Sequence, residues 1–120
     1  MATLIRTCKF SPYRKGAGPS FTLKLWDTGN LDSRGQTYLG YRLTTTDKVC
    51  VFEGEDFAGS PMHADDSDET VAGLMSFLCL QPGDTDADYF ESYTAAQLAF
   101  AAEHAEALRC EVSNRFGNDS

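Results

Sequence analysis

The spacing of the apolar residues changes once along this chain, near residue 53, and that change limits the folds open to it. Before residue 53, apolar positions such as Phe21, Leu23 and Leu25 alternate with polar Thr22 and Lys24. A period of two is typical of a strand with one buried face. After residue 53 the apolar residues recur every three or four positions, which is the period of an amphipathic helix. The sequence therefore predicts strands followed by helices.

Alternation and β-branched residues predict strands at 3–10, 21–27, 39–44 and 49–52. The short polar segment 45–48 is typical of a turn, so we expect the last two strands to form a hairpin. Segments 11–20 and 28–36 are rich in turn-forming residues and are expected to be loops.

The first predicted helix has one apolar stripe, formed by Val71, Leu74, Met75 and Leu78. Ser67 or Asp66 is expected to cap its start, since Asp66 and Glu69 have capping-box spacing. Pro82 and Gly83 are expected to end it. A short turn is predicted from residue 85 to residue 93.

A long helix is predicted from about residue 95 to residue 115. Thr94 and Gln97 have capping-box spacing at its start. Its expected buried stripe consists of Leu98, Ala101, Ala105, Leu108 and Val112. We expect Leu98 and Leu108, with Leu74 and Leu78, to lie against the sheet face that holds Leu23 and Leu25.

This order of elements predicts an α+β fold, in which an antiparallel sheet of about four strands packs against two or three C-terminal helices. We expect residues 1–120 to form a single domain, because a chain of this length buries roughly two-thirds of its unfolded surface. No internal repeat suggests otherwise.

The charges are as unevenly distributed as the apolar residues. Residues 1–52 contain eight basic and three acidic residues, a balance of +5. Residues 53–120 contain two basic and fifteen acidic residues, a balance of −13, and no basic residue lies between Lys48 and Arg109. Such asymmetry bears on partners and solubility rather than on the fold.

The net charge of −8 disfavours direct nucleic-acid binding and adhesion to anionic membranes, although the positive half could form a local basic patch. No apolar run is long enough for a transmembrane helix. The first residues lack the pattern of a secretion signal, so we expect a cytoplasmic protein. Its four cysteines are widely spaced and are expected to be reduced and mostly buried.

Two polar clusters resemble ion sites in part. Asp84, Asp86 and Asp88 have the opening spacing of an EF-hand loop, but the glycine and the final glutamate of that loop are missing. We therefore interpret them as acids in a first helical turn. His63 and the carboxylates after it could support a small metal-assisted, hydrolase-like enzyme, which is the alternative function. No nucleophile or cofactor motif supports catalysis, so no cofactor, metal or catalytic residue is predicted.

The acidic stretch has three interpretations: a solubilising surface, a docking face for a basic protein, or mimicry of nucleic-acid phosphates by an inhibitor from a mobile element. We predict a non-catalytic interaction module that docks a basic partner, because an acidic face accelerates encounter with one. The expected face contains Asp65, Asp66, Asp68 and Glu69, with Trp26 or Tyr89 as an aromatic anchor.

Overall fold

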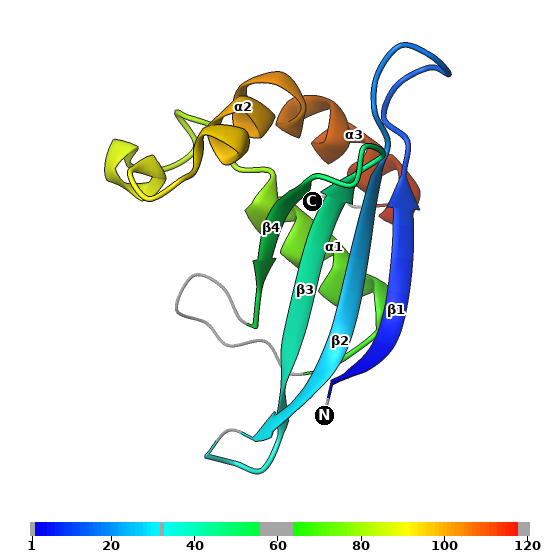
Figure 1. Ribbon diagram of the computed structural model, residues 1–120, viewed down its shortest axis with the longest axis vertical. Coiled ribbons are helices and arrows are strands. Elements are labelled where there is room, and N and C mark those ends of the chain that lie inside the picture. Colours follow the sequence, from blue (N-terminus) through cyan, green and yellow to red (C-terminus); the bar gives the residue numbers. More distant parts are fainter. Residues whose placement is uncertain (1, 32, 56–63, 118–120) are drawn as a thin grey trace. The chain divides into compact units, whose positions relative to one another are not determined.

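The computed structural model describes residues 2–31, 33–55 and 64–117 (Figure 1). The chain divides into two compact units. The first comprises Met1–Lys9 and Ser20–Ser67, and the second comprises Phe10–Pro19 and Asp68–Ser120. The prediction of a single domain stays a prediction.

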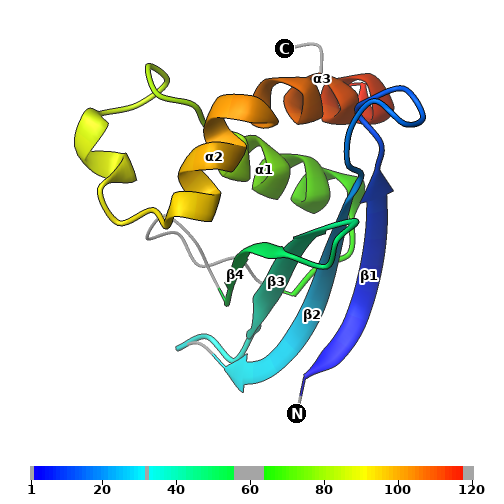
Figure 2. The same ribbon diagram turned by 45° about the horizontal axis from the view of Figure 1, so that its top comes forward.

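The first unit is built on four strands that lie side by side in the order β1-β2-β3-β4 (Figure 2). Their bounds are β1 Thr3–Phe10, β2 Phe21–Leu31, β3 Thr37–Thr45 and β4 Cys50–Gly54. With the helices of the C-terminal half, this antiparallel sheet confirms the predicted α+β class.

The alternation of the strands determines which side chains are buried. Leu23 pairs with Leu43, and Leu43 pairs in turn with Phe52, so one sheet face is continuously apolar across three strands. All three side chains are buried. The opposite face has Trp26 paired with Gly40, out of phase with the buried residues, as the alternation predicts.

The turn between β3 and β4 forms the predicted hairpin. Lys48 has a left-handed φ of 64°, and its N–H donates to the carbonyl of Thr45 at 2.9 Å. The N–H of Thr45 donates to the carbonyl of Val49 at 3.0 Å, which closes the turn.

The predicted loop at 28–36 is wrong at its first residues, because β2 continues to Leu31, which pairs with Thr37. Side chains support this irregular end of the hairpin. The Thr28 hydroxyl donates to the Tyr38 carbonyl at 2.9 Å, and Asp27 accepts from the N–H of Gly29 at 3.0 Å. Both bonds lie at the irregularity in register between Asp27 and Leu31.

The second unit contains α1 Asp68–Leu78, the 3₁₀ helix η1 Ala87–Phe90, α2 Ala95–Glu103 and α3 Ala105–Phe116. Helix α3 contacts both α1 and α2. The apolar stripe predicted for α1 is buried in full. Thr94 and Gln97 form the predicted capping box, in which each side chain accepts the backbone N–H of the other.

The predicted helix 95–115 is two helices, because the chain breaks at His104, where φ is −125° and ψ is −21°. The carbonyl of Glu103 accepts the Tyr13 hydroxyl at 3.2 Å, so a side chain from the loop contacts the backbone at the break. The burial predicted for Leu98 is wrong as well. Helix α2 buries Phe100 and Ala101, and Leu98 is 43% exposed.

The loop between β1 and β2 belongs to the second unit and is fastened to α3. Phe10 is fully buried, with its ring edge-on to Phe116 at 6.3 Å and beneath the Arg115 guanidinium at 4.7 Å. Glu111 accepts from the N–H of Ser11 at 3.3 Å and from Arg115 at 3.1 Å. These contacts position Phe116 at the end of α3.

Candidate functional site

The four acids of the predicted face are divided between the two units. Asp65 and Asp66 belong to the first unit, and Asp68 and Glu69 belong to the second. The carboxylate of Asp65 accepts both the N–H and the hydroxyl of Ser67 at 3.0 Å. The carbonyl of Asp66 accepts from Arg6 at 2.7 Å. Asp65 and Asp66 therefore help to shape the chain before α1.

Asp68 and Glu69 line a groove of about 340 Å³ on the second unit, which we call the α1 groove. Its other lining residues are Ala72, Gly73, Ser76 and Phe116. Asp68 and Glu69 occupy the first turn of α1 and are exposed. The small residues in the next two turns leave the helix surface hollow, and the ring of Phe116 from α3 forms a further wall.

The sequence interpretation did not identify Phe116 as a site residue. The sequence feature that could have identified Phe116 is its position four residues after Val112, where it continues the apolar stripe of α3. In the structure Val112 is buried, whereas Phe116, at the end of the stripe, is only partly covered and can contact a ligand. An aromatic side chain and two carboxylates therefore line the same groove.

The two predicted aromatic anchors lie in different units. Trp26 is in β2 of the first unit and lines a separate hollow of the sheet. Tyr89 is in η1 of the second unit, where its ring packs edge-on against Phe77 at 5.9 Å and Phe90 at 5.1 Å. Tyr89 thus has a packing role in an aromatic cluster that joins η1 to α1.

His63, the centre of the alternative enzymatic interpretation, lies outside the described residues. The other histidine, His104, has its Nδ1 atom 2.6 Å from the hydroxyl of Tyr13. Burial, and secondarily the charge of Glu103, raises the pKa of Tyr13, so this hydroxyl stays protonated and acts as a donor. The pair anchors the 11–20 loop at the break between α2 and α3.

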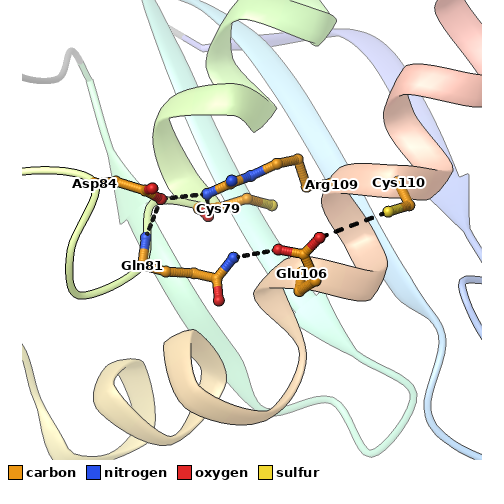
Figure 3. Close-up of polar contacts among 6 residues, drawn as sticks. All are labelled: Cys79, Gln81, Asp84, Glu106, Arg109 and Cys110. Carbon is orange, nitrogen blue, oxygen red and sulfur yellow. Dashed lines mark hydrogen bonds and ion pairs between the residues drawn. The ribbon is translucent and has the colours of Figure 1, made fainter.

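Asp84, the first acid of the EF-hand-like segment, is an ion-pair partner of Arg109 (Figure 3). Its carboxylate also accepts the N–H of Gln81 at 2.9 Å, and Arg109 donates to the Cys79 carbonyl at 2.8 Å. Gln81 donates to Glu106 at 2.7 Å. These bonds fasten the segment after α1 to α3. The described residues hold no cluster of three or more metal-ligating His, Cys, Asp or Glu side chains.

We expect the titration of Asp84 to depend on Arg109. The hydrogen bond from Arg109, followed by that from Gln81, lowers the pKa of Asp84 below its ordinary value of 3.8. The folded state therefore favours the ionised form, and this contribution to stability is complete above pH 3.8 and lost as the pH falls through the lowered pKa. In Arg109→Gln the pKa should rise, as measured by carbon-13 NMR of the carboxyl group. Arg115→Gln, which removes an arginine paired elsewhere, should leave it unchanged, and equal titration in all three proteins would refute the assignment.

The prediction of mostly buried cysteines is correct for Cys8 and Cys79 and wrong for Cys50 and Cys110, which are exposed. Cys50 begins β4 directly after a turn. Cys110 lies on α3 between the buried positions Leu108 and Val112 but faces away from them, with its thiol 3.9 Å from Glu106 (Figure 3).

Native thiol alkylation should follow this division. Iodoacetamide at pH 8 should modify Cys110 and, more slowly, Cys50, because burial and then the charge of Glu53 raise the pKa of Cys50. Cys79 should react only after unfolding, since burial raises its pKa to about 12 and blocks access. Peptide mass spectrometry measures each site. Native modification of Cys79 as fast as that of Cys110 would show that the end of α1 is open.

Comparison with protein-family models, curated proteins and solved structures finds no match to this chain. Within the described residues, no helix is both long and apolar enough to cross a membrane.

Proposed function

We propose that this chain is a non-catalytic interaction module that docks a basic protein partner through the α1 groove. The observation that supports this most directly is that two exposed carboxylates, Asp68 and Glu69, share one groove with an aromatic side chain, Phe116. The acids of this groove are two of the four that the sequence predicts for the docking face.

The chemistry of the groove suits a lysine or arginine side chain. Such a side chain has an apolar stem, which would lie along Ala72, Gly73 and Phe116, and a charged head, which would reach the carboxylates. An aromatic wall adds a cation–π contribution for a guanidinium or ammonium group nearby. The groove thus offers contact area as well as charge, whereas a merely solubilising surface needs only charge.

The charge distribution along the chain also favours a positively charged partner. Thirteen acids and no base lie between residues 49 and 108. Arg115, next to Phe116, is engaged by Glu111, and Arg109 is engaged by Asp84. A field of this sign accelerates encounter with a basic surface, and salt weakens it because the screening length is about 8 Å at 0.15 M ionic strength.

Asp68 and Glu69 also have a structural role, because acids in a first turn favour the positive end of the helix dipole. A decisive experiment must therefore separate binding from stability. Asp86 and Asp88, at the start of η1, provide the matched control, because they are exposed acids next to the start of another helical segment.

The experiment is affinity capture from lysate with four immobilised proteins: wild type, Asp68→Asn with Glu69→Gln, Phe116→Ala, and Asp86→Asn with Asp88→Asn. We expect one basic protein to be captured by the wild type and the η1 variant, less with added salt, and to be lost with the two groove variants. Thermal melts of all four show whether they remain folded. Capture that is equal across folded variants, or a captured partner that is acidic, would contradict the proposal.

A further inference from the structure

A second hollow lies on the sheet of the first unit, and the proposed docking at the α1 groove does not use it. It has a volume of about 380 Å³ and opens widely to solvent. The residues that give it its chemistry are Trp26, Thr28, Gly40, Arg42, Glu53 and Gly54. They come from three adjacent strands, and the register places Trp26, Gly40, Arg42 and Glu53 on the sheet face opposite Leu23 and Leu43.

Gly40 leaves the backbone of β3 bare beside Trp26. It lies opposite Trp26 in the ladder, two residues before Arg42 on the same sheet face. A Cβ at Gly40 would come within 3.0 Å of the Thr28 methyl group, so the position lacks room for a side chain. Gly54 lies opposite Tyr41 and, by the same register, belongs to the buried face, where a Cβ would come within 3.0 Å of the Tyr41 hydroxyl.

The polar groups of the hollow include a donor and an acceptor in close proximity. Arg42 and Glu53 pair across β3 and β4 at 3.4 Å, and their side chains are 51% and 54% exposed. The Arg42 guanidinium lies 5.7 Å from the centroid of the Trp26 ring, near the outer limit of about 6 Å for a cation–π contact. Because exposed ion pairs contribute little to stability, both groups can bond a ligand at little cost.

This combination selects a class of ligand. The carboxylate balances the guanidinium, so the residues that line the hollow have no net charge. A neutral sugar ring fits, since its C–H face can stack on an indole while its hydroxyls donate to Glu53 and accept from Arg42. The volume lies in the usual range for small-molecule sites, at the end that holds one or two rings.

We propose that the Trp26 hollow is a binding site for a neutral carbohydrate. Trp26 is the single tryptophan of the chain, so its fluorescence reports on this site alone. The experiment titrates the full chain with cello-, malto-, manno- and chito-hexaose. At least one should change the emission saturably, and the change should persist in 0.5 M salt because no net charge is involved.

Variants test whether the sugar binds in the hollow. Their affinities are measured by isothermal titration calorimetry, because Trp26→Ala removes the tryptophan whose fluorescence is otherwise followed. Trp26→Ala should weaken binding of the active sugar by about tenfold or more, as loss of an aromatic anchor does. Trp26→Phe should retain part of the affinity, because it keeps a ring. Arg42→Gln and Glu53→Gln should each weaken binding, while Lys15→Gln and Glu91→Gln, which change one charge outside the sheet, should not.

The same titration with oligothymidylate and polyglutamate tests for binding of an anionic polymer. The proposal is overturned if none of the four sugars gives a response, or if Trp26→Ala leaves binding intact in a protein that still melts cooperatively. It is also overturned if only the two anionic polymers give a response and salt abolishes it, because the face would then bind an anionic polymer. The Asp68→Asn, Glu69→Gln variant should bind the sugar normally, so failure of this proposal and failure of the docking proposal are distinguishable.

Discussion

Replacing Phe10 with alanine should lower the free energy of unfolding by about 3–5 kcal/mol, which is the usual cost of deleting a fully buried phenylalanine ring. The ring is 0% exposed, packs edge-on to Phe116 and lies beneath Arg115. Its removal leaves a cavity and takes away the contact that holds the end of α3. Urea denaturation followed by circular dichroism measures the change.

Phe10→Leu is the matched control, because it fills most of the same volume and should cost clearly less. Phe10→Ala should also broaden the NMR signals of Phe116, since that ring loses its neighbour. If Phe10→Ala costs under about 1 kcal/mol, well below the range for such truncations, the loop is not anchored as described.

The second large effect should distinguish two leucines of the predicted stripe. Leu108→Ala should cost about 2–5 kcal/mol because Leu108 is fully buried on α3. Leu98→Ala should change stability by less than about 0.5 kcal/mol, as surface substitutions usually do. Leu98 is 43% exposed on α2. The same urea melts, run side by side, test the difference.

A continuous helix from 95 to 115 would give similar losses at both leucines, because its stripe would be one buried surface. Equal losses would therefore contradict the exposure of Leu98. The expected ranking, with Leu108 far above Leu98, follows from the difference in burial between the two side chains.

The strands and the stripe of α1 could be predicted from sequence because each is determined locally. Alternation at Phe21, Leu23 and Leu25 and helical spacing at Val71, Leu74 and Leu78 are repeated signals that one residue does not change. The capping box at Thr94 and Gln97 is equally local, and the structure has it as predicted.

The helix break could not be predicted, because its partner lies about ninety residues away in sequence. Tyr13 supplies the hydroxyl that Glu103 and His104 contact. Nothing within the segment 95–115 breaks a helix, since it contains no proline or glycine. A tertiary contact outweighed a local preference that is worth little per residue.

Two of the acids proposed from the sequence line the α1 groove, and whether they bind a partner stays a prediction. The acidic residues were evident from charge alone, and Asp68 and Glu69 do line a groove. Phe116 was not predicted, because its role depends on the packing of α3 beside α1, and Tyr89 proves to pack in an aromatic cluster. The hollow at Trp26 depends on which residue faces Gly40 across the ladder, and this requires the register of two strands.

The central claim, that the α1 groove receives basic side chains, is tested most directly by NMR titration with one probe. A twelve-residue peptide of alternating lysine and leucine is added to nitrogen-15-labelled protein at 0.15 M salt. We predict saturable shifts centred on Asp68, Glu69, Gly73 and Phe116, which disappear in the Asp68→Asn, Glu69→Gln variant. Shifts of equal size at the exposed acids Asp86, Asp88 and Glu91, or shifts that the variant leaves unchanged, would contradict the claim and leave the acidic span as a solvated surface.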